Sequence, residues 1–173
     1  MKRQGMVFLT GLTFIFLVTA SGCAQRVATT PGEPSEYPEY AGKGYLIELG
    51  DIKEGTFDTP PYLPAKIRYQ LAQDLKERGL LAPPTGAEKR LIANVTVSAS
   101  YPYYTPIRRC EECYGILTSR VDVVDPSNSR VIAETVIRSY NAWSRNLSDN
   151  TELTNAEEIA RFLEGILHSP SSR

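Results

Sequence analysis

The sequence is poor in the residues on which most catalytic and metal sites depend. It contains one histidine, His168, so a Ser–His–Asp grouping could form only around a residue near the C-terminus. There is no glycine-rich phosphate loop, and no basic run of the kind that binds nucleic acid. We therefore expect neither an enzyme, nor a bound cofactor or metal, nor a nucleic-acid-binding protein. A hydrolase built on two carboxylates stays open, because pairs formed in space do not show in a sequence.

No apolar run reaches the roughly 20 residues that a membrane-spanning helix requires. The N-terminal run Met6–Val18 is 13 residues long, follows the positive residues Lys2 and Arg3, and leads into small residues at 19–22. This order of a positive, an apolar and a small-residue region is typical of a secretory signal peptide. We therefore interpret residues 1–22 as a signal that is removed, in preference to a retained helix.

The sequence Ala20-Ser21-Gly22-Cys23 resembles the lipobox of bacterial lipoproteins, with Ala20 where leucine is usual. The resemblance implies cleavage before Cys23, diacylglycerol on its sulfur, and an acyl chain such as palmitate on its new amino group. Several acyl chains hold a protein stably at a membrane. Ala24 follows where an aspartate would resemble an inner-membrane retention signal, so we expect the outer membrane, with the domain facing the periplasm. The alternative is an ordinary signal peptide that ends near a cysteine.

Cleavage leaves 151 residues, enough for one domain with a hydrophobic core. Loss of Lys2 and Arg3 leaves 17 basic and 20 acidic residues, hence a net charge of −3. Residues 23–43 are rich in proline, glycine and glutamate and poor in aliphatic side chains, which indicates a flexible, lipid-anchored tether. Residues 169–173 are expected to form a disordered tail.

The residues between tether and tail carry the periodicities of four strands and two helices. Ile67, Leu71 and Leu75 recur at helical spacing, Pro64 suits the first turn, and Gly79 suits the left-handed stop. Alternating apolar and polar residues predict strands. Before a second apolar helical stripe, the motif Thr-Asn-Ala-Glu has the form of a capping box. The predicted strands are 44–51, 91–100, 117–123 and 131–139, and the predicted helices are 64–78 and 154–168.

This order predicts a single α+β domain over residues 44–168, with the succession β-α-β-β-β-α. We expect one mostly antiparallel, mixed sheet with both helices on one face, because each helix has a single apolar stripe to bury. The other face carries polar residues, among them Thr96, Ser98, Thr118 and Arg120. That face is either plain solvated surface or a docking surface.

The predicted succession contains a helix that ends in LKERGLL at 75–81 and a strand hairpin with the sequence GILTSRVDVVDPSNSRVIAE at 115–134. This succession resembles small bacterial outer-membrane lipoproteins of an uncharacterised family, accessory lipoproteins of envelope assembly machines, and the amino-terminal domain of TolB. The resemblance covers about residues 44–167, lies in pattern and order, and includes no catalytic signature. It implies a periplasmic adaptor or assembly module.

Cys110 and Cys113 are the free pair that remains once Cys23 carries lipid. A zinc site usually needs four Cys or His ligands, so two chains would have to pool their thiolates. A redox role needs a stabilised thiolate, which Arg108 and Arg109 favour, whereas the two intervening glutamates oppose it and no helix opens behind the motif. Because the periplasm is oxidising, a disulfide is the expected fate of two neighbouring thiols.

The connection 100–114 is too long for a tight hairpin, and loops longer than about 12 residues are often functional. Tyrosine and arginine are favoured at interfaces, and a loop stiffened by a disulfide loses less entropy on docking. We predict that the loop binds another envelope protein through Tyr101, Tyr103, Tyr104, Arg108, Arg109 and Tyr114. The alternative is an insertion whose tyrosines pack on their own domain.

The anchor, tether, small domain and loop together predict a periplasmic adaptor or assembly accessory. The alternative function is a carrier of lipid or another small apolar ligand. A large apolar cavity between sheet and helices would support the carrier, whereas a close-packed interior would argue against it.

Overall fold

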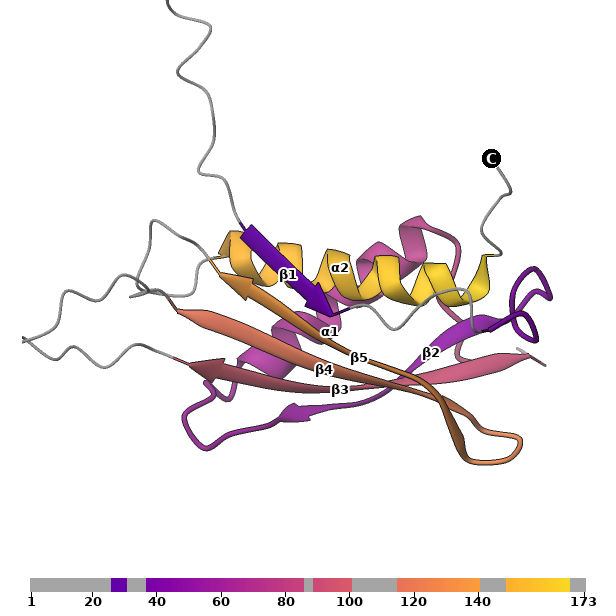
Figure 1. Ribbon diagram of the computed structural model, residues 1–173, viewed down its shortest axis with the longest axis horizontal. Coiled ribbons are helices and arrows are strands. Elements are labelled where there is room, and N and C mark those ends of the chain that lie inside the picture. The colour runs from indigo at the N-terminus through magenta and orange to yellow at the C-terminus, as the bar shows by residue number, and fades with distance from the viewer. Residues whose placement is uncertain (1–25, 31–36, 86–88, 101–114, 141–148, 169–173) are drawn as a thin grey trace, which may run out of the picture.

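Five strands form one sheet in this computed structural model, which describes residues 26–30, 37–85, 89–100, 115–140 and 149–168. The elements are β1 (Arg26–Thr30), β2 (Leu46–Glu54), α1 (Leu63–Glu77), β3 (Arg90–Ser100), β4 (Ile116–Asp125), β5 (Arg130–Tyr140) and α2 (Asp149–Leu167). The order across the sheet is β1-β5-β4-β3-β2. β2 and β3 run parallel, whereas the other neighbouring strands are antiparallel (Figure 1).

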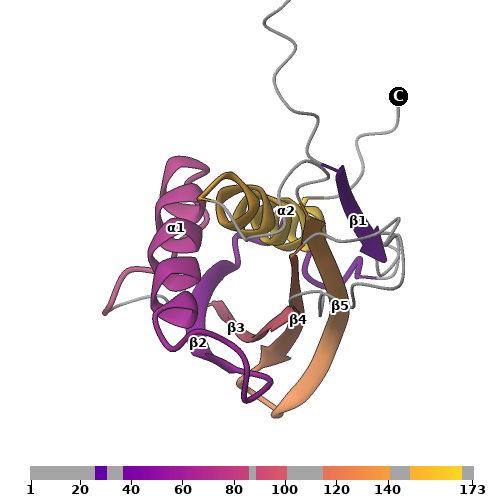
Figure 2. The ribbon, with the colours of Figure 1, turned by 90° about the vertical axis from the view of Figure 1, so that its left-hand side faces the viewer.

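Both helices cover the same face of this mixed sheet, which curves around them in the end-on view of Figure 2. From β2 onwards the succession is β-α-β-β-β-α. The predicted α+β class, the mixed and mostly antiparallel sheet, and the placement of both helices on one face are therefore confirmed.

The core follows from the periodicity of each element. One residue in every two is buried along β3 from Leu91 to Ala99, which matches the side-chain period of a strand. Each helix buries one stripe at helical spacing against the sheet. The apolar residues of these stripes that are at most 1% exposed are Leu63, Ile67, Leu71 and Leu75 in α1, and Ala156, Ile159, Ala160, Leu163 and Ile166 in α2.

The C-terminal end of α1 has the structure that its sequence predicts. Gly79 has a φ of 68°, the left-handed conformation that glycine adopts without steric cost. The amide of Gly79 donates to the carbonyl of Lys76 (3.0 Å), and the amide of Leu80 donates to that of Leu75 (2.8 Å). These two hydrogen bonds form a Schellman motif, and Leu80 is buried just beyond it.

The N-terminal end of α2 differs from its prediction. The helix begins at Asp149, five residues before Thr154, so the predicted capping box lies inside the helix. Glu157, expected to bond back to the helix start, instead forms an ion pair with Arg161 one turn later (2.6 Å). The capping interpretation was wrong because the same spacing of Thr and Glu also occurs within helices.

Two parts of the segment 23–43, predicted as a tether, belong to the fold. β1 pairs antiparallel with β5 as an edge strand that the sequence analysis missed. Tyr40 is buried, and the amide of Gly42 donates a hydrogen bond to the carbonyl of Leu167 at the end of α2 (2.8 Å). The folded part of the chain therefore begins before Gly44, whereas composition predicted that it begins at Gly44.

A polar contact lies in the interior beneath α2. Asn155 is fully buried, and its side-chain oxygen accepts a hydrogen bond from the hydroxyl of Ser119 in β4 (2.6 Å). Its side-chain amide donates to the hydroxyl of Ser139 in β5 (3.0 Å). Because unpaired polar groups are costly in an interior, this contact fixes where α2 lies along the two strands.

Replacing Asn155 with alanine should lower the free energy of unfolding by about 1–3 kcal/mol, because two buried hydroxyls lose a partner. Denaturant unfolding followed by circular dichroism measures the change. Thr154→Ala is the matched control on the half-buried side of α2 and should change stability by less than about 0.5 kcal/mol. Equal effects of the two substitutions would contradict the structural role of Asn155.

A second polar contact joins the segment before β2 to the β4–β5 turn. The hydroxyl of Tyr40 donates a hydrogen bond to the carboxylate of Asp125 (3.0 Å). Burial, and then this hydrogen bond, raise the pKa of Tyr40 to about 12. Hydrogen bonds from Ser127, and then from Tyr40, lower the pKa of Asp125. The folded protein thus favours a neutral phenol beside an ionised carboxylate.

The contribution of Tyr40 to stability should be present below the unperturbed tyrosine pKa of 10.0 and lost as pH rises through about 12. In that window the folded chain keeps a proton that the unfolded chain gives up, so the free energy of unfolding falls as pH rises. We expect Tyr40→Phe to show a shallower alkaline decline in denaturant titrations. The exposed-site control Tyr69→Phe should keep the wild-type slope. A Tyr40→Phe profile parallel to wild type would refute the assignment.

Candidate binding surface

The turn between β2 and α1 holds one aromatic side chain entirely in solvent. Phe57 is 102% exposed, yet the turn around it is internally bonded. The amide of Thr59 donates to the carbonyl of Thr56 (3.1 Å), and the two threonine hydroxyls lie 2.8 Å apart. Thr59 is buried, and its hydroxyl oxygen accepts a hydrogen bond from the amide of Ala99 at the end of β3 (3.2 Å). Phe57 is therefore displayed by an ordered turn.

The two helices run in the same general direction and pack against each other at an angle, and two ion pairs join them. Lys66 pairs with Glu152, and Arg78 pairs with Glu164. Both pairs join residues 86 positions apart in sequence, so the helices are in register over three turns. The pairing holds the outer surfaces of α1 and α2 in one fixed arrangement.

An apolar patch spans the outer surface of these helices, and we call Tyr62, Lys66, Tyr69 and Leu153 the helix-pair surface. Tyr62, Tyr69 and Leu153 are 58%, 66% and 43% exposed. Lys66 lies about one turn from each tyrosine on α1, and its ion-pair partner is the residue before Leu153 on α2. Exposed tyrosines beside an aliphatic residue are the composition that protein interfaces favour.

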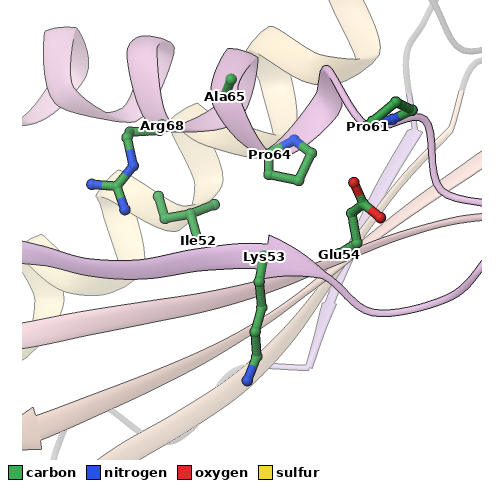
Figure 3. A pocket seen from close by; sticks show the side chains of 7 residues that line it. All are labelled: Ile52, Lys53, Glu54, Pro61, Pro64, Ala65 and Arg68. Atoms are coloured by element: carbon green, nitrogen blue, oxygen red, sulfur yellow. The ribbon is translucent and has the colours of Figure 1, made fainter.

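An open cleft of about 520 Å³ separates the second half of β2 from the first half of α1. Its lining residues are Ile52, Lys53, Glu54, Pro61, Pro64, Ala65 and Arg68 (Figure 3). Ile52 points toward α1 and forms an apolar wall with Pro64 and Ala65, whereas Lys53 points away from α1. The lining contains no cysteine, serine or histidine nucleophile. The cleft suits an apolar side chain of a partner protein better than a reacting ligand.

Arg68 closes part of the outer edge of β2. Its guanidinium donates to the carbonyls of Leu49 (3.4 Å) and Gly50, where the register with β3 shifts. The shift brings the side chain of Asn94 against Gly50, where a Cβ atom would lie 2.2 Å from its oxygen. That oxygen accepts a hydrogen bond from the amide of Asp51 (2.9 Å). A bulge and a capping arginine are common protections of an edge strand against unwanted pairing.

The sheet face opposite the helices is polar, as the sequence predicts. Thr96, Ser98 and Thr118 are half-buried there, and Arg120 is exposed. Arg120 pairs with Asp122 (3.3 Å) and also with Glu134 on β5 (3.0 Å). The hydrogen bond to Asp122 is the main reason that the pKa of Arg120 is raised. Because these charges satisfy one another, the arrangement favours a solvated face.

The residues that the sequence analysis singled out as sites lie outside the described part of the chain. They are the lipidation residue Cys23, the cysteines Cys110 and Cys113, and the loop residues Tyr101, Tyr103, Tyr104, Arg108, Arg109 and Tyr114. Their roles remain predictions. The described flanks of the loop, Ser100 and Ile116, are paired with each other at one end of the sheet.

The helix-pair surface and the displayed turn were not found from the sequence, although signals for both are present. Tyr62 and Tyr69 are seven residues apart, on the side of the helix away from the apolar stripe of Ile67 and Leu71. Phe57 is a lone aromatic residue in a turn bounded by glycine and proline. Aromatic residues in such polar surroundings are a signal for a functional surface.

The described ranges bring together no group of three or more His, Cys, Asp or Glu side chains that could hold a metal ion. Neither α1 nor α2 combines the length and the hydropathy needed to cross a bilayer.

No protein-family model and no curated protein sequence matches the chain. Solved structures with a similar arrangement include the PelC dodecamer from Paraburkholderia phytofirmans. It is 18% identical, has a TM-score of 0.48, and the match covers 84% of this chain and 99% of that chain.

A protein assigned as a lipoprotein from Caulobacter crescentus is 13% identical, with a TM-score of 0.35 and coverage of 69% and 87% of the two chains. A homolog of the neuraminyllactose-binding hemagglutinin from Helicobacter pylori is 12% identical, with a TM-score of 0.36 and coverage of 78% and 87%. At these identities and TM-scores the similarities carry no functional argument.

Removing either partner of the Lys66–Glu152 ion pair should lower the free energy of unfolding, but by different amounts. The Glu152 side chain is 6% exposed and the Lys66 side chain is 41% exposed. Lys66→Met should therefore lower the free energy of unfolding by about 1–3 kcal/mol, because it leaves a buried carboxylate without its cation. Glu152→Gln should cost less, since Lys66 can turn to water.

Thermal unfolding measures both variants of this pair. Arg161→Met, which removes the pairs of the exposed Arg161 with Glu157 and Glu158 within α2, is the control and should stay within about 0.5 kcal/mol of wild type. A larger loss for Glu152→Gln than for Lys66→Met would contradict the role of burial.

Proposed function

We propose that this chain is a lipid-anchored lipoprotein of the bacterial outer membrane whose domain binds another envelope protein as a periplasmic adaptor or assembly accessory. The role is non-catalytic. The N-terminal signal and the lipobox-like residues before Cys23 support the anchor. The helix-pair surface is the observation that carries the adaptor function.

The helix-pair surface supports protein binding for three reasons. Its tyrosines and leucine are large and exposed, and Lys66, about one turn from each tyrosine, pairs with the residue that precedes Leu153, whereas scattered single apolar residues are normal on any surface. The Lys66–Glu152 pair and the packed helices beneath hold the patch rigid, so little conformational entropy is lost on docking. The cleft beside the first half of α1 offers room for an apolar side chain of the partner.

The packing between the sheet and the helices does not favour the alternative function, a carrier that holds its ligand inside the domain. Ile67, Leu71, Leu91, Ile159 and Leu163 have no exposed surface and belong to one packed cluster. A lipid carrier of this architecture would need this space for its ligand. We therefore do not advance the carrier function.

A photoreactive amino acid at position 69 of the full-length chain should capture one recurrent envelope protein in intact cells. The same probe at Arg138, an exposed residue of β5, is the control and should not capture it. The double variant Tyr69→Ser, Leu153→Ser should reduce copurification of that protein about tenfold, the loss expected for removing a central contact.

Two further variants separate the parts of this proposal. Cys23→Ser should release the protein from the membrane fraction, and retention there would remove the lipid anchor from the proposal. Tyr103→Ala with Tyr104→Ala tests the predicted loop contact, and an unchanged interaction would confine binding to the helix-pair surface. If the probe at position 69 captures nothing at native abundance, the helix-pair surface is not the docking surface. If in addition no envelope protein copurifies with the wild-type chain, the adaptor function is wrong.

A further inference from the structure

One end of the sheet contains the first residues of β1 and β4 and the last residues of β5 and β3. In the strand register, Arg26 pairs with Tyr140, Tyr140 with Ile116, and Ile116 with Ser100. These four residues form one row across β1, β5, β4 and β3. Figure 2 looks onto this end of the molecule.

The turn that displays Phe57 lies at the same end. The amide of Gly55 donates to the carbonyl of Val97 in β3 (2.7 Å), and Thr59 accepts from the amide of Ala99 (3.2 Å). Both bonds attach the turn to the last residues of β3, next to Ser100. The start of β1 and the Phe57 turn therefore occupy the two outer corners of one sheet end.

Only a short stretch of sequence separates the proposed lipidation residue from the first of these corners. Cys23 precedes Arg26 by three residues, and an extended chain spans about 3.3–3.6 Å per residue. The lipidated cysteine therefore stays within about 11 Å of the start of β1. A lipid anchor on so short a connection brings this end of the sheet to the membrane surface.

We infer that this sheet end faces the bilayer and that Phe57 inserts into the membrane interface at the corner opposite the lipid on Cys23. The inference rests on the lipid anchor of the proposed function. Four strand spacings of about 4.8 Å place the two corners roughly 19 Å apart along the sheet. Two separated attachments hold the line between the two corners along the membrane surface, whereas one anchor alone would leave its direction free.

The chemistry of the turn fits the interface of a bilayer. Phe57 is the apolar residue, Tyr62 adds an amphipathic ring at the start of α1, and Asp58 between them is exposed. Aromatic residues partition to the interface, whereas a carboxylate does not enter the hydrocarbon. Asp58 therefore limits insertion to the depth of one side chain. One phenylalanine binds a membrane weakly, but the anchor raises its effective concentration there.

This orientation also places the proposed docking surface. Tyr69 lies seven residues along α1 from Tyr62, about 10 Å at 1.5 Å per residue. The helix-pair surface thus begins beside the membrane and extends away from it. It would meet a partner whose apolar surface lies just beneath the bilayer.

The test uses tryptophan fluorescence of the lipidated full-length protein in vesicles of phosphatidylethanolamine and phosphatidylglycerol with brominated acyl chains. The chain has one tryptophan, so Phe57→Trp is made together with Trp143→Phe. Against unbrominated vesicles, emission from the tryptophan at position 57 should fall at least about twofold, as expected for a side chain at the headgroup–acyl boundary. Tyr69→Trp in the same Trp143→Phe background is the control and should lose less than about a tenth.

The outcomes separate the inference from the proposed function. Flotation of the protein with vesicles, without quenching of the tryptophan at position 57, would overturn the insertion of this turn and leave the anchor intact. Failure of the lipidated chain to float would overturn the anchor itself. If Trp143→Phe does not fold, a photoreactive residue at position 57 of the otherwise native chain replaces it. A lipid adduct then supports the inference, and a protein adduct refutes it.

Discussion

Burial of two apolar helix stripes on one face of one sheet is the constraint on which the rest of this structure depends. Each helix is amphipathic and must cover the same set of alternating strand residues, so α1 and α2 lie side by side. Their outer contacts then fall into register, as Lys66–Glu152 and Arg78–Glu164 show. Within the interior, Asn155 forms hydrogen bonds with both Ser119 and Ser139.

The same packing decides what remains available for binding. The inward faces of the helices are used by the core, and Arg120, Asp122 and Glu134 pair with one another on the open sheet face. Among the described residues, the largely exposed aromatic side chains lie on the outer side of α1 and on the turn before it. Function in this domain therefore belongs to surfaces and ends of elements, where rigid backbone displays side chains that the core does not need.

The sequence predicted correctly those features that depend on interactions between residues close together in the chain. The Schellman end of α1 at Gly79, the alternation along β3 and the stripe of α1 all depend on residues within a few positions of each other. The order of elements from β2 to α2 follows from these local patterns. The start of α2 could not be placed in this way, because Thr154 and Glu157 have the spacing of a cap but lie within the helix.

The sequence by itself determined the class of domain, the residues of its core and the prediction of a lipidation signal at its N-terminus. Only the tertiary structure decided that β1 joins the sheet beside β5, because a five-residue strand near prolines is defined by its partner and not by its own periodicity. It likewise decided that Tyr62, Tyr69 and Leu153 share one surface, since they come from two helices whose register no local pattern specifies.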